Sequence, residues 1–392
     1  MLATFCFMSS NMLANPIVAG YAESLGADGM LMGAVAGSMS FISLFCRPIA
    51  GNFSDKTSKR TLVAVGTVLY FAAGLLYYFA NSPIMLIMAR VINGVGFACC
   101  SVCLATWMSL LLPIRHMGAG MGLYGTMNAL AMAVGPALGI RAQKYIGYRL
   151  TFLSSLVLAV IMLIATLMVK NGGQPVRKKR TSITENPSTA VDIDGSASAT
   201  KKHRFSIRSI LEPRVVPLSL TFMMFAIAYF ANQSFIVNYV QSRHLPVSSD
   251  LFFMFYAVAL LVLRLGLRDL FDSKGFRFWL TVCSLGMLAM LACMTFLFND
   301  WMLLLAAIFT AVGYGLMSSV TQAQAVVIAG RERSGIANST YYAGIDLGMS
   351  VGPFVGGLVY GRLSAVWFYP VFMLAMPVAW LIYLLCVKRV SR

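Results

Sequence analysis

Twelve runs of mostly apolar residues follow one another along the chain, and each is long enough to cross a lipid bilayer as a helix. A spanning helix needs about 20 such residues, because the hydrocarbon layer is roughly 30 Å thick. Turn-forming Asn, Asp, Pro and Gly residues lie in the breaks between them. The runs cover residues 1–25, 29–50, 61–80, 84–111, 117–140, 149–169, 215–240, 249–267, 277–298, 301–328, 335–360 and 366–387.

The composition excludes a water-soluble globule. Hydrophobic residues make up 59% of the 392 residues and charged residues only 11%, with a mean hydropathy of +0.79. The alternating strands of about ten residues that build membrane barrels do not recur. We therefore expect an all-α polytopic membrane protein with twelve transmembrane helices.

The positions of Lys and Arg predict the orientation. With a cytosolic N-terminus, 24 of the 30 basic residues lie on the cytosolic side, five lie outside and Arg90 lies within a span. Because basic loops are retained in the cytosol during insertion, we expect both termini inside, in a plasma membrane or a bacterial inner membrane. This asymmetry accounts for the net charge of +17 without nucleic-acid binding.

A hydrophilic segment divides the chain into similar halves. Residues 171–213 have too few apolar side chains for a core, which predicts a flexible cytosolic linker between domains 1–170 and 214–392. Several residues recur across it at one offset of 217 positions. The pairs are Asn15 and Asn232, Gly96 and Gly313, Gly118 and Gly335, Gly135-Pro136 and Gly352-Pro353, and Gly139 and Gly356. Internal duplication of this kind is typical of secondary transporters, whose substrate site lies between the halves.

Charge is concentrated in "RPIAGNFSDKTSKR", residues 47–60, and partly repeated in "RLGLRDLFDSKGFR", residues 264–277. We interpret these stretches as a cytosolic gate, in which Gly51 allows close helix approach and Asp55 pairs with a helix terminus or an Arg. The basic residues would lie at headgroup level. The alternative is a basic loop that only sets topology. The gate residues are Arg47, Gly51, Asp55, Lys56, Lys59, Arg60, Arg264 and Asp272.

Three stretches resemble signatures of one family, the major facilitator superfamily. They are the loop "GNFSDKTSKR", "RVINGVG" at 90–96, and "GPALG" at 135–139, which resembles an antiporter signature although Ala131 and Ile140 replace glycines. The resemblance implies two pseudo-symmetric six-helix bundles that transport a small molecule by alternating access, most like the twelve-helix drug:proton antiporters. It implies a helix-packing role for Gly135, Pro136, Gly139, Gly348, Gly352, Pro353 and Gly356.

Asp346 is the only acid deep inside a predicted span, and Arg90 is the corresponding cation of the first half. A charge at that depth costs about 2.5–3.5 kcal/mol, so it usually has a function or a partner. Burial favours the uncharged acid, and we expect Asp346 to carry a coupled proton with Arg90 as its coupled cation. For Asp346 the alternatives are a substrate contact and a structural acid. For Arg90 they are a substrate contact, a transient pair with an acid, and bonds to backbone carbonyls.

Polar side chains inside the spans are candidates for a substrate cavity, although each can equally bond to a neighbouring helix. These are Asn11, Asn15, Asn93, Asn128, Asn232, Tyr239 and Tyr342. No catalytic triad, phosphate loop or metal-ligand cluster is visible, so we expect neither an enzyme nor a cofactor or metal.

Together these features predict a monomeric secondary transporter in the lipid bilayer that exports a small, partly apolar molecule in exchange for protons. Two alternatives stay open. One is uptake or facilitated diffusion of a sugar, nucleoside or organic acid on the same fold. The other is a non-transporting membrane sensor.

Overall fold

The computed structural model describes residues 1–112, 117–169, 173, 211–267, 270, 274–330 and 334–390. Throughout these residues the regular structure is helical, and none of them forms a strand. A helix bonds all its backbone groups within one segment, which lipid demands of a spanning chain. The expected all-α class is confirmed. Most of the predicted 171–213 linker lies outside the described residues.

In the N-terminal half, the residues that the structure describes form six spans from five helices. Helix α5 supplies two of them, because Gly147 interrupts its backbone at φ 74°. Glycine is the residue that adopts a positive φ without strain, so it permits this reversal. The helices are α1 (Leu2–Ser24), α2 (Gly29–Lys56), α3 (Lys59–Tyr78), α4 (Pro83–Leu111) and α5 (Met117–Leu167).

Among the described residues, the C-terminal half forms six further spans. Helices α10 and α11 join through the π-helical turn η3 into one span, and η5, α13 and α14 form the last. The elements are α6 (Val216–Ser242), α7 (Ser249–Gly266), α9 (Phe276–Thr295), α10 (Asp300–Thr310), η3 (Ala311–Leu316), α11 (Met317–Ala329), α12 (Ser334–Arg362), η5 (Ala365–Trp367), α13 (Phe368–Met373) and α14 (Ala375–Val390).

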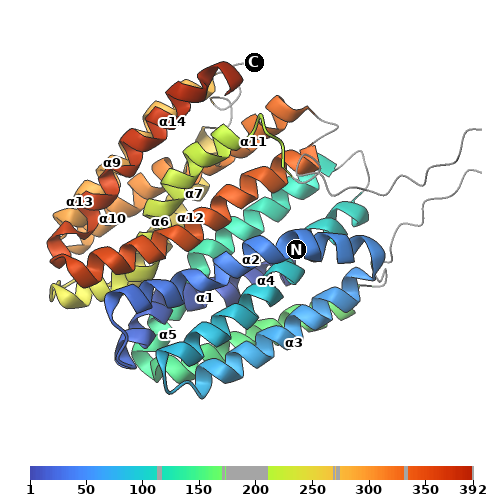
Figure 1. Cartoon of the computed structure of the whole chain (residues 1–392), viewed down its shortest axis with the longest axis horizontal. Coiled ribbons are helices and arrows are strands. Elements are labelled where there is room, and N and C mark those ends of the chain that lie inside the picture. The colour runs from blue at the N-terminus through green and yellow to red at the C-terminus, as the bar shows by residue number, and fades with distance from the viewer. Residues whose placement is uncertain are drawn as a thin grey trace, which may run out of the picture.

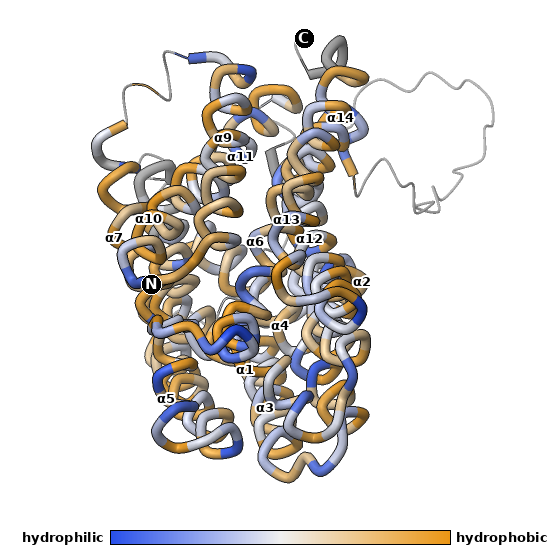
Figure 2. The backbone as a smooth tube through the Cα atoms, turned by 90° about the vertical axis from the view of Figure 1, so that its left-hand side faces the viewer, coloured by the Kyte–Doolittle hydropathy of each residue, from blue (hydrophilic) through white to orange (hydrophobic). Residues whose placement is uncertain are grey.

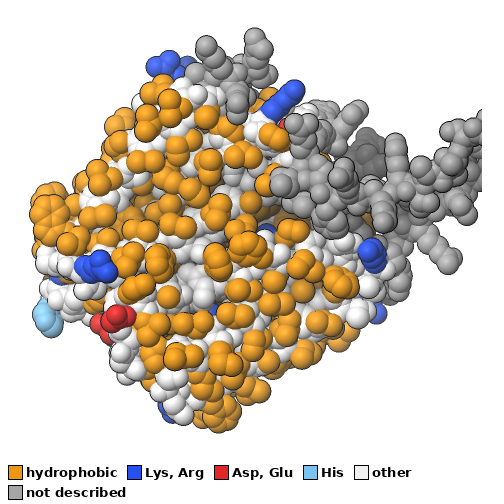
Figure 3. Space-filling view, in the orientation of Figure 1, with side chains coloured by type: hydrophobic (Ala, Val, Ile, Leu, Met, Phe, Trp, Pro, Cys, Tyr) orange, Lys and Arg blue, Asp and Glu red, His pale blue; other side chains and the backbone are white. Residues whose placement is uncertain are grey.

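Apolar side chains cover the outside of the molecule, as expected for helices in lipid. Figure 3 shows them across most of one face, with most of the charged side chains near its margins. Ten segments of the described chain are long and apolar enough to span a membrane. Dividing α5 at Gly147 and adding the 18-residue α7 gives the twelve expected spans.

The two halves form two bundles that lie side by side (Figures 1 and 2). In the first bundle α1 packs on α5, and α2 packs on α4. In the second, α6 packs on α12 and α14. Contacts between the bundles are made chiefly by three pairs of helices: α2 with α12, α5 with α7, and α1 with α6. These six helices therefore form the interface between the two bundles.

The repeated glycines lie where helices within a bundle approach most closely. A Cβ at Gly135 would lie 2.9 Å from the Ser9 carbonyl oxygen of α1, and a Cβ at Gly352 would lie 2.5 Å from the Ile227 carbonyl oxygen of α6. Any larger residue would push these backbones apart. The neighbouring members of the motif make similar contacts: Gly139 meets Leu13, Gly348 meets Ala226 and Gly356 faces Phe235. Pro136 and Pro353 lie inside α5 and α12.

Candidate functional site

Asp346 lies near the middle of α12 and is paired across the two bundles. Its Oδ1 accepts a hydrogen bond of 3.0 Å from Arg47 Nη2, and its Oδ2 lies 2.6 Å from Arg47 Nε. Arg47 belongs to α2, so the two partners are 299 residues apart in sequence. One charge-assisted hydrogen bond and one close ionic contact therefore hold the guanidinium to the carboxylate. The pair joins the halves at one point.

The two members of the pair differ in access to solvent. The Arg47 side chain is 22% exposed, whereas that of Asp346 is 2% exposed. Two rings flank the guanidinium, whose central carbon lies 5.3 Å from the Phe97 ring centre and 5.8 Å from the Tyr342 ring centre. Tyr342 is itself 37% exposed. The cation is therefore the partly exposed member of the pair and lies beside aromatic rings, while the acid is buried.

Removing one partner of such a pair is costly. An acid as buried as Asp346 keeps its charge only while a cation compensates it, and loss of one member of a buried ion pair costs about 3–5 kcal/mol. Protonation of Asp346 would remove its charge without removing the side chain. The arrangement can thus exist in a paired, charged form and in a protonated form that leaves Arg47 free.

Arg90, the coupled cation suggested by the sequence, bonds to other groups in this structure. Its guanidinium donates to the backbone oxygens of Ala36 (2.6 Å) and Val35 (3.3 Å) in α2, and to Asn15 Oδ1 (3.1 Å) in α1. Arg90 is only 2% exposed. In this structure it ties α4 to α2 and α1, which is the structural alternative considered above.

At one end of the interface, α2 and α12 are in backbone contact, and we call this the Gly29 end. A Cβ at Gly29 would lie 2.5 Å from Gly361, and one at Gly33 would lie 2.6 Å from the Pro353 oxygen. One turn further along α2, Gly37 meets Ser350 in the same way. No side chain fits between the helices there. The bundles are therefore closed at this end.

The opposite end of α2, the Lys56 end, lacks such contact. A Cβ at Gly51 would meet no atom within 4 Å among the described residues, so the close approach expected for Gly51 is absent. Lys56 is exposed. Lys59 is buried rather than at headgroup level, and its N–H donates to the Gly173 oxygen at 3.0 Å. Arg60 donates to the Val169 oxygen.

The side chains of two predicted gate acids are not described by the structure. Asp272 lies outside the described residues, and so does the side chain of Asp55. Arg264, in α7, is half-buried, and its Nε has no hydrogen-bond partner among the residues that the structure describes. It lies within electrostatic range of the Tyr256 and Tyr341 hydroxyl groups.

Sequence reasoning missed Glu23, at the Gly29 end of α1. Its Oε2 accepts a hydrogen bond from Asn238 Nδ2 of α6, and its side chain also bonds to Tyr360 of α12. Tyr148 of α5 lies within electrostatic range. Glu23 thus connects the first bundle to two helices of the second. The glycine spacing of α2, at 29, 33 and 37, was a visible signal for closure there, but nothing in the sequence pointed to Glu23.

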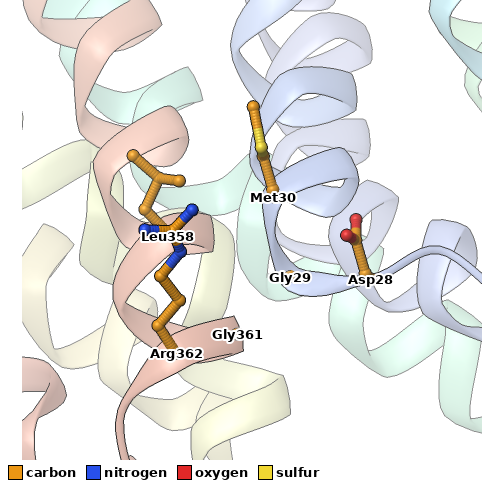
Figure 4. Close-up of a pocket in the computed structure, with 6 residues that line it drawn as sticks. All are labelled: Asp28, Gly29, Met30, Leu358, Gly361 and Arg362. Atoms are coloured by element: carbon orange, nitrogen blue, oxygen red, sulfur yellow. The ribbon is translucent and has the colours of Figure 1, made fainter.

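A small pocket opens at the Gly29 end between α2 and α12. Its volume is about 220 Å³, and Asp28, Gly29, Met30, Leu358, Gly361 and Arg362 line it. Figure 4 shows Asp28 and Arg362 on opposite sides of the junction. The Asp28 carboxylate caps α2 by accepting from the Leu31 N–H at 2.8 Å. This pocket lies beyond the closed contact and is separate from Arg47.

The cavity candidates fall into two groups. Some tie helices together: Asn15 accepts from Arg90, Asn232 accepts from Tyr369 at 2.8 Å, and Tyr239 donates to the Met294 oxygen at 3.1 Å.

The others have polar capacity left over. Both amide atoms of buried Asn11 and the Oδ1 of Asn93 have no partner among the described residues. The same holds for both amide atoms of Gln233 on α6, which sequence reasoning missed. Asn128 is half-buried and bonds to Tyr124, and Tyr342 bonds to Gln322.

No group of three or more metal-ligating His, Cys, Asp or Glu side chains occurs in the part of the chain that the structure describes. The eight cysteines are free thiols. The chemistry available at the interface is therefore that of the Arg47–Asp346 pair, the surrounding tyrosines and the unpartnered amides.

The chain matches one family along its whole length. The family model described as Major Facilitator Superfamily matches residues 1–300 and 275–392. An uncharacterized MFS-type transporter of Methanocaldococcus jannaschii is 22% identical over 369 residues, which cover 93% of this chain and 90% of that protein. An SPX domain-containing membrane protein of Arabidopsis thaliana is 32% identical over 169 residues, which cover 42% of this chain and 24% of that protein.

Solved transporters share the fold at low sequence identity. A crystal structure of the nucleoside transporter NupG gives a TM-score of 0.71 at 12% identity, covering 100% of this chain and 97% of that chain. A POT family transporter in complex with 5-aminolevulinic acid gives a TM-score of 0.75 at 10% identity, covering 100% of this chain and 96% of that chain. At these identities the similarity concerns the fold.

Proposed function

Because the chain belongs to the Major Facilitator Superfamily and is a membrane transporter of that fold, we propose that it moves a small molecule by proton-coupled alternating access. The domains that move are the bundles 1–170 and 214–392, joined by the linker 171–213. The observation that carries the proposal is the ion pair between Arg47 and Asp346, which links the bundles near the middle of the interface. Asp346 is the proton carrier, and Arg47 replaces Arg90 as its coupled cation.

The pair supports coupling because its two forms hold the bundles differently. In the charged form, the carboxylate draws α2 and α12 together at 2.6–3.0 Å. Protonation of Asp346 weakens this attraction, because a neutral acid can still accept a hydrogen bond from the guanidinium but loses the attraction between opposite charges. A ligand can shift a conformational equilibrium only through its different affinity for the two states, and the proton meets this condition at Asp346.

We further propose that the Lys56 end faces the cytosol, with both termini inside a plasma membrane or a bacterial inner membrane. The distribution of basic residues supports this orientation. The closed Gly29 end then faces outward, so the structure represents an inward-facing state. The protein acts as a monomer, because each chain contains both bundles and the interface between them.

The direction of proton movement depends on which member of the pair the substrate engages. A substrate that competes with the proton for Asp346 is exchanged for protons, and the resemblance to drug:proton antiporters supports export by this mode. A substrate that takes Arg47 instead leaves Asp346 without its cation, which favours proton uptake, so proton and substrate move together. Uptake of an organic acid is therefore the second candidate, and the exposure of Arg47 favours it.

Proteoliposomes with a trapped pH-sensitive dye test the proposal. Movement of one member of a panel of organic cations, neutral drugs, organic acids, nucleosides and sugars should change the internal pH with wild-type protein. Asp346→Asn keeps the size of the side chain but not the titratable group, so it should abolish gradient-driven accumulation while exchange without a gradient survives. If Asp346→Asn accumulates substrate as well as wild type does, the proton does not travel on Asp346.

A further inference from the structure

We infer that the substrate is a small organic anion, whose carboxylate or phosphate group takes the place of the Asp346 carboxylate on Arg47. This inference rests on the proposed function and names the substrate class of the same site. Proton and substrate then move in the same direction, because the substrate binds the cation that Asp346 loses.

The first reason is access. Of the two charged partners, Arg47 is the more exposed, at 22% of its side chain against 2% for Asp346. An approaching molecule therefore meets the guanidinium before it meets the carboxylate. A cationic substrate would have to displace Arg47 before it touched the acid, whereas an anion can begin to bind while the pair is still formed.

The second reason is the balance of charge. Among the described residues of the interface helices, Arg47 and Arg264 occupy equivalent positions in the two halves, 217 residues apart. Asp346 has no equivalent acid, because Ala129 stands at its position in the first half. Arg264 and Arg47 both lie beside tyrosines of α12, respectively Tyr341 and Tyr342. An excess of cations in a cleft with low-dielectric walls concentrates anions.

The third reason is the shape of the surface around Arg47. Its planar fork can hold an oxyanion with two parallel hydrogen bonds, and the Asp346 carboxylate occupies it with one hydrogen bond from Nη2 and a close ionic contact to Nε. The Phe97 and Tyr342 rings flank the fork, and Tyr342 is 37% exposed. A flat, apolar body attached to the oxyanion would therefore bury ring surface while its charged group binds Arg47.

The consequence for protons follows from the groups around Asp346. The charged and titratable groups near it, in the part of the chain that the structure describes, are Arg47 of α2, Tyr342 of α12 and Tyr124 of α5, which lies near Arg47. Arg47 is the only cation among them. Once an anion engages Arg47, the buried carboxylate has no counter-ion, and it takes a proton from water.

The test measures binding to the purified full-length protein in lipid nanodiscs by titration calorimetry at pH 6 and pH 8. The probes are benzoate, its neutral counterpart benzamide, and inorganic phosphate. An oxyanion should bind wild type more tightly at pH 6, and benzamide should not bind. If benzoate binds and inorganic phosphate does not, the substrate carries a carboxylate. If phosphate binds and benzoate does not, the substrate carries a phosphate group.

Two variants should move the affinity in opposite directions. Asp346→Asn removes the competing carboxylate, so the anion should bind about tenfold tighter and without pH dependence. Arg47→Gln should weaken binding at least about tenfold. The double variant Arg47→Gln, Asp346→Asn has no uncompensated buried charge and serves as a control for folding. It should melt as a single folded species and bind no oxyanion.

Several results would overturn the inference. The first is that benzamide binds wild type as tightly as benzoate does. The second is that Asp346→Asn and Arg47→Gln both lose affinity for the oxyanion. The third is that Asp346→Asn, in which Arg47 has no competing carboxylate, binds no oxyanion. Anion binding with the expected variant effects but without internal acidification during uptake into proteoliposomes would leave the substrate class standing and refute proton coupling. The two proposals therefore fail separately.

Discussion

Closure of the Gly29 end depends on the absence of side chains, so adding a single methyl group there should open it. Gly33→Ala, between Gly29 and Gly37, is a suitable perturbation, because all three of its nearest contacts are backbone atoms of α12, which cannot rotate away. The new Cβ would lie 2.6 Å from the Pro353 oxygen and 3.0 Å from the Gly357 Cα and the Phe354 oxygen.

The cost follows from this crowding. Ordinary contact begins at 3.4 Å, so α2 and α12 must separate by about 0.8 Å at Gly33 to accept the methyl group. Overpacking by one carbon typically costs about 1–3 kcal/mol. Only the closed state bears this cost, so the equilibrium between states closed and open at the Gly29 end should shift toward the open state by about 5- to 150-fold.

Distances between two spin labels, measured by pulsed electron paramagnetic resonance on the protein in nanodiscs, report this shift. Spin labels at Asn81→Cys and Phe298→Cys, in a background whose native cysteines are replaced, lie on exposed loops of different bundles at the Gly29 end. The longer-distance population should grow in Gly33→Ala.

Gly96→Ala is the matched control. A Cβ at Gly96 meets the Gly66 oxygen at 3.0 Å and Tyr70 at 3.1 Å, both inside the first bundle. It should lower the melting temperature without changing the distance distribution. Identical distributions for Gly33→Ala, Gly96→Ala and wild type would show that the glycine contact does not control closure.

Three further predictions follow from single residues. Glu23→Gln replaces a charged acceptor with a neutral one, so it should weaken closure of the Gly29 end by about 1 kcal/mol, or roughly fivefold, in the same distance measurement. Ser24→Ala is the control, because in the described structure Ser24 bonds only to Tyr21 of its own helix. Arg90→Gln should cost roughly 1.5–3 kcal/mol of stability through the lost bonds to α2, which a lower melting temperature would show. The number of protons moved per substrate should stay unchanged. A changed ratio would return Arg90 to the coupling role expected from the sequence. Asp55→Asn should preserve expression and slow transport severalfold if Asp55 latches the cytosolic end, and wild-type turnover together with unchanged labelling of cytosolic cysteine probes would remove the latch.

The spans and their order could be predicted from the sequence because the bilayer imposes a one-dimensional rule. A run of about 20 apolar residues satisfies it wherever the run occurs, so local composition locates each helix within a few residues. The break at Gly147 and the cap at Asp28 follow equally local rules, since both depend on the backbone of one turn. The packing glycines of α5 and α12 were likewise visible as a repeat.

Which charges meet could not be predicted in this way. Arg47 was assigned to a cytosolic gate, and Arg90 was expected to be the cation coupled to Asp346, because depth along each helix was the only coordinate that the sequence offered. A long Arg side chain reaches well beyond its own turn, so depth alone does not fix its partner. The crossing of α2 over α12 brings Arg47 to Asp346, whereas the packing of α4 against α2 and α1 gives Arg90 two backbone oxygens of α2 and the Asn15 oxygen of α1.

The sequence by itself determined twelve spans in two similar halves and one acid deep inside a span, because lipid constrains every helix separately. Only the tertiary structure decided that this acid pairs with Arg47 across the two bundles, that the Gly29 end is closed, and that the cation is the exposed partner. These properties depend on contacts between helices hundreds of residues apart, and the energy of such a contact exists only once both helices are in place.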